Sequence, residues 1–427
     1  MNFYKSSIYT LAYTFVFQLN GLIITKITAH KYGPAGSVIM GDFNNLLAIF
    51  NTFTCIGISS GFIKYIAEFK NDELKKYQIF NTGFTLVFIG SLLVGLLALI
   101  GSKYWSIYLF NTIEYYDAFM IYGATVILFA LQIIVLGFLN GNFEIKKLAF
   151  LNVVVAIAHL ILTVLLIQFI GIKGAMITNI TMGSLITIAG TILLWNSKIL
   201  NFNKIKLQID NSLLFPFFKY GALATIASFL LAIVMIKLRD YIQLHVSDET
   251  AGYWTAMNSL SDRLSSALLA AIIVYFLPKM SEDLDQNTFT REVRKAFKRV
   301  LPITALILIL FWLSKDLIIQ LLLSIKFYSM RDIFGPQMVG LFFKVGATIF
   351  STIALGKAMI KTAIFTELIY LFLLYNLSLL FINYYGWKGG AYGYAVANIL
   401  YFFIYAFAFR GVLVAVKKSV LPKPWIK

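Results

Sequence analysis

The stretch "MVGLFFKVGATIF", residues 338–350, decides the fold class, because it is the middle of a membrane-spanning segment. Similar apolar runs recur from one end of the chain to the other, and each is long enough to cross about 30 Å of hydrocarbon as a helix. One lysine, Lys344, lies at the centre of this run, where a charge costs at least about 2.5–3.5 kcal/mol. We therefore expect Lys344 to face protein or water rather than lipid.

The composition excludes an ordinary soluble protein. Of the 427 residues, 60% are hydrophobic and 13% are charged, and the mean hydropathy is +0.82. Ordinary globular chains carry about 25% charged residues. The apolar runs are continuous, as is typical of membrane-spanning helices. The chain is therefore predicted to be an all-α polytopic membrane protein.

Twelve membrane spans are predicted. They lie at 8–28, 37–63, 79–101, 117–140, 149–170, 174–195, 215–240, 251–277, 300–323, 333–355, 362–383 and 390–415. With the N-terminus in the cytoplasm, most lysines and arginines fall in cytoplasmic segments, as the positive-inside rule requires. Both termini are then cytoplasmic. The formal net charge of +17 is interpreted as this topology signal, in contact with anionic membrane lipids, and not as nucleic-acid binding.

Five basic residues share one face of a predicted helix just before the ninth span. They follow the spacing i, i+3, i+4, i+7 and i+8, and they are Arg291, Arg294, Lys295, Lys298 and Arg299. We interpret this face as part of a helix lying on the anionic headgroups of the membrane. A regulatory partner protein is the alternative.

The longest polar connection, "NSKILNFNKIKLQIDNS", bisects the chain and indicates two halves. "GIKGAMITN" begins at Gly171, and the similar "GWKGGAYGYAVAN" begins at Gly386, 215 residues later. The common offset favours an internal duplication, with halves of the same topology related by an axis along the membrane normal. The predicted parts are a six-helix bundle at 1–195, a cytoplasmic linker at 196–214 and a second six-helix bundle at 215–427.

Ionisable residues inside the spans are candidates for a functional site, because burying them is costly. They include Lys26, Asp42, Lys64, Arg239, Asp262, Arg263, Lys344 and Glu367. Some have structural alternatives: Lys26 and Lys64 can extend to the headgroups, and Asp262 can form a structural ion pair with a basic neighbour. Because the set is more basic than acidic, a water-filled cavity that it lines would attract anions, phosphate above all.

Polar uncharged side chains also interrupt the spans, Asn44 among them. They can hydrogen-bond sugars or, alternatively, neighbouring helices. The sequence contains no P-loop motif, no H-E-x-x-H and no C-x-x-C, and its three histidines are scattered. We therefore expect a transporter driven by gradients, with no catalytic residues, no metal and no cofactor. Coupling to H⁺ or Na⁺ through Asp42, Asp262 or Glu367 is part of this hypothesis.

Three stretches resemble a known family: 32–69, the segment "GYWTAMNSLSDRLSSALLAAIIVYFLPKMSE" at 252–282, and "LLLSIKFYSMRDIFGPQMVGLFFKVGATIFSTIALGKA" at 321–358. They are similar to the Wzx-type O-antigen translocases and lipid III flippases, in the polysaccharide branch of the multidrug/oligosaccharidyl-lipid/polysaccharide exporter (MOP) superfamily. The resemblance implies a MATE-like fold of two six-helix bundles packed as a V around a basic central cavity. It implies a flippase of the bacterial cytoplasmic (inner) membrane.

The implied substrate is an undecaprenyl-pyrophosphate-linked oligosaccharide, moved to the periplasmic leaflet by alternating access. The positions that match the family pattern are Lys64, Arg239, Asp262, Lys344 and Glu367. Asn44 departs from it, where a basic residue is expected in lipid III relatives, and Arg263 is an additional charge. These departures favour an O-antigen or related surface-polysaccharide unit.

The resulting hypothesis assigns the pyrophosphate and sugars to Lys344, Lys64, Arg239, Arg263, Lys26 and Asn44. A glycan polymerase is the expected protein partner. Two rival functions remain. A multidrug exporter of the same superfamily would favour an acidic cavity, and an assembly scaffold for a polymerase would not need a lysine in mid-span.

Overall fold

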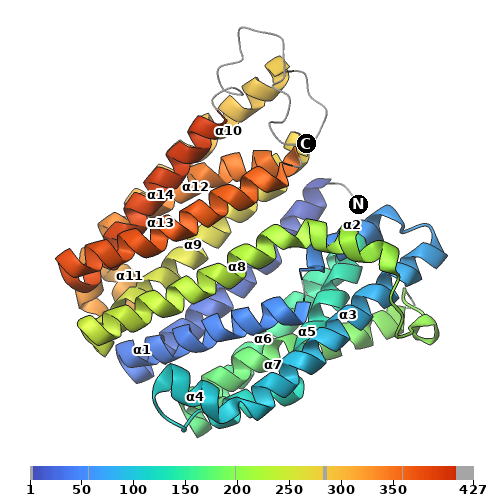
Figure 1. Ribbon diagram of the computed structural model, residues 1–427, viewed down its shortest axis with the longest axis horizontal. Helices are drawn as coiled ribbons and strands as arrows, with labels where there is room; N and C mark the ends of the chain where they lie inside the picture. Colours follow the sequence, from blue (N-terminus) through green and yellow to red (C-terminus); the bar gives the residue numbers. More distant parts are fainter. Residues whose placement is uncertain (1–2, 56, 198, 282–285, 358, 410–427) are drawn as a thin grey trace. The chain divides into compact units, whose positions relative to one another are not determined.

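The computed structural model describes residues 3–55, 57–197, 199–281, 286–357 and 359–409, and every regular element in these ranges is helical (Figure 1). A chain that crosses a bilayer must satisfy its backbone hydrogen bonds internally, and a helix does so within one segment. The all-α membrane fold predicted from the sequence is confirmed. The end of the last predicted span, 410–415, lies outside the described residues.

The described part contains twelve long helices once α1 (Phe3–Cys55) is divided at its kink. The kink lies at Gly33, with φ 63° and ψ −156°, followed by Pro34. The other long helices are α3 (Glu73–Ile100), α5 (Tyr116–Gly141), α6 (Ile145–Ile170), α7 (Ile172–Ser197), α8 (Asn211–His245), α9 (Asp248–Ser281), α10 (Gln286–Leu313), α12 (Phe334–Gly356), α13 (Ile360–Tyr385) and α14 (Gly389–Ala408). Each predicted span falls on one of these helices.

Two predicted spans are wrong at one end. The span at 37–63 was expected to be continuous, but α1 ends at Cys55 and α2 (Ser59–Glu68) begins after a bend of 44°. The span at 300–323 is also interrupted, because α10 ends at Leu313 and the short helix α11 (Lys315–Leu322) follows. Each break contains short polar residues, Ser59 and Ser60 at the first and Ser314, Lys315 and Asp316 at the second, which the window used to draw the spans averaged out.

Seven helical stretches of the described chain are long and apolar enough to cross a membrane, or eight if α1 from Thr14 and α2 form one bent span. One of these stretches, Lys361–Ala408, includes both α13 and α14. Large apolar side chains are exposed along the helices; on α3 alone, Leu93, Leu97 and Ile100 are 59%, 61% and 85% exposed. Such surfaces suit contact with lipid rather than water.

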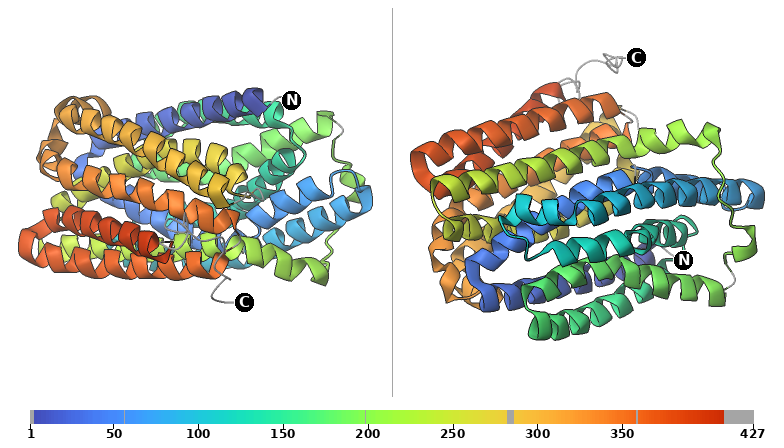
Figure 2. Two further views of the ribbon diagram at one scale, coloured as in Figure 1. Left: turned by 90° about the horizontal axis from the view of Figure 1, so that it is seen from above. Right: turned by 60° about the horizontal axis from the view of Figure 1, so that its bottom comes forward.

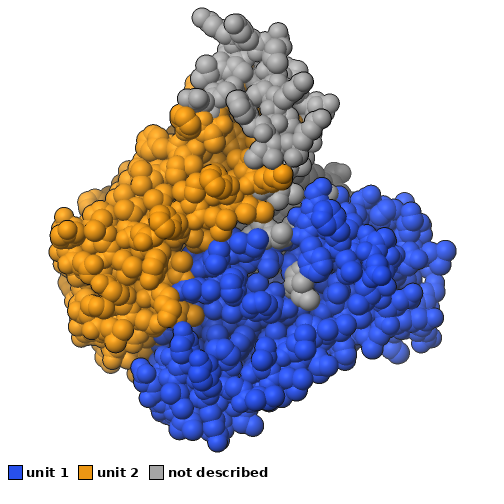
Figure 3. Space-filling model, viewed as in Figure 1, with its two compact units in different colours: residues 1–28, 39–233 blue, residues 29–38, 234–427 orange. Residues whose placement is uncertain are grey.

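The chain divides into two compact units, one of 1–28 with 39–233 and the other of 29–38 with 234–427 (Figure 3). In the first unit, α5 packs against α2, α3 and α7, and α6 packs against α7. Its core contains Phe62, Phe80 and Phe138, and the Phe80 and Phe138 rings meet edge to face with centroids 5.4 Å apart.

The second unit repeats this arrangement of neighbours. Here α12 packs against α9, α10 and α14, and α13 packs beside α14 (Figure 2). The kinked segment 29–38 belongs to this unit and approaches α9 closely, because a Cβ on Gly252 would lie 2.4 Å from the Pro34 carbonyl oxygen. The core includes Leu238, Ile242 and Trp254.

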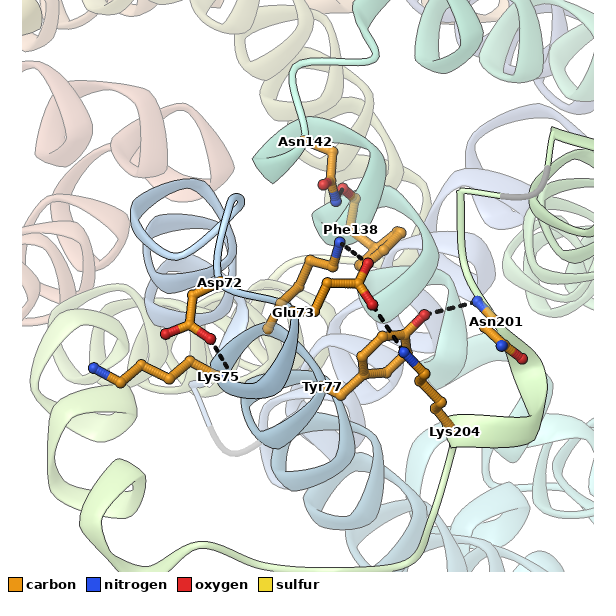
Figure 4. A network of polar contacts seen from close by, with 9 residues as sticks. Asp72, Glu73, Lys75, Tyr77, Phe138, Asn142, Asn201 and Lys204 are labelled. Carbon is orange, nitrogen blue, oxygen red and sulfur yellow. Dashed lines mark hydrogen bonds and ion pairs between the residues drawn. The ribbon is translucent and has the colours of Figure 1, made fainter.

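The segment after α7 lies along α3 and contains the short 3₁₀ turn η1 (Phe202–Lys204). Figure 4 shows the Tyr77 hydroxyl accepting a hydrogen bond from the Asn201 backbone N–H at 2.8 Å, and the Lys204 ammonium donating to Glu73 at 2.8 Å. This hydrogen bond to the Glu73 carboxylate raises the pKa of Lys204 above its ordinary value. The predicted division at 196–214 into two six-helix halves stays a prediction.

The helix pairs α6–α7 and α13–α14 turn in the same way. Gly171, with φ 72° and ψ −144°, ends α6, and Gly386, with φ 59° and ψ −151°, ends α13. Only glycine readily adopts this backbone conformation. Near each turn, a lysine also forms an ion pair with an aspartate 56 positions earlier in the sequence. Lys173 pairs with Asp117 at 3.1 Å, and Lys388 pairs with Asp332 at 2.6 Å. Both ion pairs and both glycines are thus related by the 215-residue offset.

Candidate functional site

Lys344 lies in the middle of α12 and takes part in a polar cluster inside the second unit. Two glycines flank it, and a Cβ on Gly340 or Gly346 would lie only 2.5 Å from the Tyr394 ring or 2.8 Å from the Phe402 ring of α14. Small residues of this kind let membrane helices approach closely. The Lys344 ammonium is 3.6 Å from a carboxylate oxygen of Asp262 on α9.

The opposite side of this cluster is formed by α13 and α14. The Tyr401 hydroxyl of α14 donates a hydrogen bond of 2.7 Å to Glu367 Oε2 of α13. The rings of Tyr401 and Tyr370 lie with centroids 4.6 Å apart. Glu367 and Tyr370 are also close enough to Lys344 to interact with it electrostatically. Four helices therefore bring one ammonium, two carboxylates and several phenols together.

Amides extend the cluster along α9 and α12. Gln337 Nε2 donates to Asn258 Oδ1 at 3.1 Å, and both side chains are buried. The Gln337 Oε1 atom and the Tyr394 hydroxyl are buried with no hydrogen-bond partner among the described residues. Buried polar atoms normally have partners, so these two atoms are available to a polar ligand.

The ion pair at the centre is open on one side. The Asp262 side chain is 66% exposed, whereas the Lys344 side chain is 26% exposed. When both are ionised, Asp262 and Glu367 carry two negative charges against the one positive charge of Lys344, which leaves one negative charge in excess. Protonation of either carboxylate, or the approach of a second anion to Lys344, therefore changes which partner the ammonium binds.

The other candidates of the second unit lie apart from this cluster or at its margin. Arg239 on α8 is only 2% exposed, and its Nε donates to Thr255 Oγ1 of α9 at 2.9 Å. This contact connects α8 to α9 about two helical turns before Asp262. Arg263 is partly buried and interacts electrostatically with the neighbouring Asp262.

The candidates of the first unit do not form a comparable cluster. Lys26 and Lys64 are both exposed, and the Lys64 ammonium lies 4.9 Å from the centroid of the adjacent Tyr65 ring. Asn44 is exposed, and its Oδ1 accepts a hydrogen bond of 2.8 Å from Asn179 of α7. Asp42 is buried, at 1% exposure. Of the nine candidates, the structure thus joins Lys344, Asp262 and Glu367.

Sequence reasoning missed the tyrosines of this cluster. The signal was present on α14, where buried polar residues recur at i, i+4, i+7 and i+11, which places them on one face of a helix. They are Tyr394, Asn398, Tyr401 and Tyr405. A polar stripe through an apolar span indicates contact with protein or water. It was missed because the candidates were selected mainly by their charge.

Known proteins resemble this chain over nearly its whole length. The lipid III flippases of Escherichia coli (strain K12) and Shigella flexneri are each 28% identical to it over 402 residues, covering 94% of this chain and 97% of theirs. These relatives and the solved structures below support a flippase of the MOP superfamily. The relatives are named as flippases and transporters, which supports a transporter rather than an enzyme. No protein-family model matches the chain.

Solved structures show that the flippase has the MATE fold. An inward-facing MATE multidrug transporter of the MOP superfamily superposes with a TM-score of 0.73 at 12% identity, over 97% of this chain and 96% of the other. An outward-facing structure of such a transporter gives 0.64 at 13% identity, over 96% of each chain. Likeness at such identities concerns the fold alone, and the predicted MATE-like architecture is confirmed at that level.

Proposed function

We propose that this flippase moves an undecaprenyl-pyrophosphate-linked oligosaccharide, the repeat unit of an O-antigen or a related surface polysaccharide. It works from the cytoplasmic to the periplasmic leaflet of the bacterial inner membrane, with both termini in the cytoplasm. The observation that carries the proposal is an ammonium group at mid-span, Lys344, which pairs with a largely exposed carboxylate within a cluster of hydroxyl and amide groups. The 28% identity to two lipid III flippases supports the substrate class.

Lys344 is the group that binds the pyrophosphate in this proposal. Its present partner, Asp262, is largely exposed. The distance of 3.6 Å between the two groups is longer than that of a good charge-assisted hydrogen bond. A phosphate oxygen can approach the ammonium from the open side. The phenols of Tyr394 and Tyr401 and the Gln337 amide lie in the same cluster and offer hydrogen bonds to sugar hydroxyls.

The two carboxylates give the site a means of ion coupling. The titratable groups that interact with Lys344 are Asp262 from α9 and Glu367 and Tyr370 from α13. Tyr401 donates a hydrogen bond to Glu367, and Tyr394 and Arg263 interact with Asp262. When a proton binds Asp262 or Glu367, Lys344 loses a competing negative charge and binds phosphate more strongly. Release of that proton restores the competing charge and weakens phosphate binding, so the occupancies of proton and phosphate are linked at this site. Proton exchange can therefore accompany alternating access.

The membrane potential adds to the direction of transport. An anion that moves outward from a negative interior gains about 2.3 kcal/mol per charge per 100 mV. A pyrophosphate diester carries about two such charges, and its polyprenyl chain can remain in lipid throughout. A glycan polymerase is the proposed partner, because the flipped unit is the substrate that such an enzyme extends; co-purification of the two proteins tests this.

Complementation of a flippase-deficient bacterium tests the proposal. Replacing one partner of a close charge contact costs about 2–5 kcal/mol, so Lys344→Ala should reduce flipping at least about 30-fold. The readouts are surface polymer and the amount of protein in the membrane. The matched control is Lys103→Ala on α4 (Ser102–Phe110), an exposed lysine outside the cluster, which should retain normal polymer. Normal polymer from Lys344→Ala, with normal protein, would end the proposal.

A multidrug exporter is the second candidate. The observation that favours it is the pair of carboxylates, Asp262 and Glu367, near a single ammonium, which suits a cationic drug. Expression in a strain that lacks its own drug pumps separates the two functions. Resistance that depends on Asp262 and Glu367, without complementation of the flippase-deficient strain, would favour the exporter.

A further inference from the structure

A pocket lies within the second unit between α9 and α10, and Lys344 is not among its lining residues. It has a volume of about 360 Å³, within the usual range for small-ligand sites of about 300–1,000 Å³. We propose that this pocket binds one anionic phospholipid, with an acyl chain between the helices and the phosphate at Lys295 and Arg299. The proposal does not depend on the identity of the transported substrate.

The lining of the pocket follows one stripe of α10. The residues on this helix recur at helical spacing from one end of the pocket to the other, and they are Glu292, Lys295, Ala296, Arg299, Val300, Ile303, Thr304 and Ile307. From Glu292 to Ile307 the helix rises by about 22 Å, at 1.5 Å per residue. Ala267, Leu268 and Phe276 of α9 form the facing wall. The result is a long apolar groove of a shape that suits an extended hydrocarbon chain.

The charges of the pocket lie at one end only. Glu292 is 8% exposed and accepts an ion pair of 2.7 Å from Lys295, so the acid is already balanced. Arg299 follows one turn later and is exposed. Over 291–299 there are five basic residues and one acidic residue. This end of the pocket therefore favours an anion, whereas the rest favours hydrocarbon.

The position of these charges matches the two parts of a lipid. The stretch Thr288–Leu313 is apolar enough to cross a membrane, and its basic residues all precede Val300. The basic segment that the sequence places on the headgroups is continuous with the rest of α10. Its charges therefore lie at the interface while the groove continues into the hydrocarbon, where an acyl chain fills it more favourably than water does.

A neighbouring groove provides a natural comparison. On the other face of α10, between α10 and α12, a pocket of about 510 Å³ is lined by apolar residues alone, including Ala305, Trp312 and Phe342. It has the apolar character but no charged side chain. We expect it to accept lipid chains without regard to headgroup, because only the pocket with Arg299 and Lys295 can distinguish an anionic from a zwitterionic lipid.

Native mass spectrometry of the full-length protein from nanodiscs tests the proposal. The discs contain equal amounts of phosphatidylglycerol and phosphatidylcholine, and the measurement is which lipid stays bound. The wild type should retain one phosphatidylglycerol in preference to phosphatidylcholine. Arg299→Gln should lower the affinity for phosphatidylglycerol about fivefold, because a basic residue at an anionic surface contributes about 1 kcal/mol. Ala267→Phe, which fills the groove, should remove the bound lipid.

Two matched controls lie on the same helix. Lys298→Gln removes one charge from the same segment but outside the pocket, and Ala305→Phe fills the uncharged groove; both should retain the bound phosphatidylglycerol. An equal loss in Lys298→Gln would show a diffuse charge effect and overturn the proposal. Equal retention of both lipids by the wild type would also overturn the proposal. Displacement of the bound phosphatidylglycerol by undecaprenyl phosphate would overturn it too, because the groove would then be a site for the substrate's own chain. Ala267→Leu replaces Ala267→Phe if the larger variant fails to fold.

Discussion

The helix pairs α6–α7 and α13–α14 share a scaffold but differ in the chemistry that it holds. Both have a glycine of positive φ at the turn and a Lys–Asp ion pair beside it, at the same 215-residue offset. At that same offset, Lys344, Glu367 and Tyr401 correspond to Phe129, Asn152 and Ile186. The charged cluster of the second unit therefore has no charged counterpart at these positions of the first.

The first unit has a neutral polar group instead. His159 on α6 is 2% exposed; its Nδ1 lies 3.2 Å from Asn20 Nδ2 and its Nε2 lies 3.0 Å from the Thr178 carbonyl oxygen. The Asn20 amide nitrogen, as assigned, can only donate, so Nδ1 accepts and Nε2–H donates to the carbonyl. This arrangement satisfies a neutral imidazole. The comparison teaches that helix packing is repeated between the two units, whereas the cluster of Lys344, Asp262 and Glu367 lies in one of them.

Replacing a glycine that packs against backbone atoms should have the largest effect on stability, and the effect should be equal in the two helix pairs. A Cβ on Gly389 would lie 2.1 Å from the Phe381 carbonyl oxygen, and a Cβ on Gly174 would lie 2.2 Å from the Leu166 carbonyl oxygen. Backbone atoms cannot yield as a flexible side chain does, so Gly389→Ala and Gly174→Ala should each lower the free energy of unfolding by about 2–3 kcal/mol. Thermal unfolding in detergent measures both.

Gly335→Ala on α12 is the control for this pair. A Cβ there would meet only Trp312 Nε1, at 3.6 Å. The change should leave stability unaltered or raise it by about 0.4–1 kcal/mol, because alanine restricts the unfolded chain. If only one of the two glycine variants were destabilised, the helix pairs would not be equivalent in packing, and the comparison between the halves would lose its structural basis.

The second prediction concerns the chemistry that differs. Asp262→Asn imitates the protonated carboxylate, so pyrophosphate should bind Lys344 at every pH and release should become slow. We expect flipping to fall at least about fivefold and to lose its pH dependence, since couplings of this kind are worth about 1–3 kcal/mol. His159→Gln keeps a neutral polar group in the first unit and should keep the pH profile of the wild type. Initial rates of flipping in proteoliposomes across a pH series measure both variants.

The outcome sharpens the comparison in either direction. If His159→Gln also abolished the pH dependence, both halves would take part in proton exchange. If Asp262→Asn kept a normal pH profile, Glu367 would be the remaining carboxylate beside Lys344, and Glu367→Gln should then show the loss. Retention of the profile by both carboxylate variants would remove proton coupling from this cluster.

The sequence predicted the helices well because each span repeats the same simple signal, an apolar run of sufficient length. It failed at Cys55 and Leu313, where the span was drawn through short polar or glycine-containing breaks, at 57–61 and 314–316, because the residues on both sides are apolar. For the site, the cost of burying charge was enough to select Lys344, Asp262 and Glu367. Their grouping depends on helix packing, which no single span reveals.

The same limit explains the candidates that did not join the cluster. Arg239 was selected by the same argument as Lys344, as a basic residue of a predicted span, yet it is 2% exposed and bonded to Thr255. Whether a buried charge binds a ligand or a neighbouring helix is decided by its partners. Those partners come from other helices, and the tyrosines around Glu367 were missed for that reason.

The smallest effects are expected from the duplicated ion pairs. Lys173 and Asp117 are 27% and 42% exposed, and Lys388 and Asp332 are 40% and 50% exposed. Pairs this accessible contribute only about 0.2–1 kcal/mol, because solvent screens them. Asp117→Asn and Asp332→Asn should therefore each lower stability by less than about 1 kcal/mol. They should also leave the pH profile of flipping unchanged. Thermal unfolding at low and high salt measures the effect, which should shrink with salt in both variants alike.

A much larger loss of stability in Asp332→Asn alone would mean that the ion pair of the second unit also supports the cluster around Lys344. The chemical difference between the two units would then extend to the helix packing that they share.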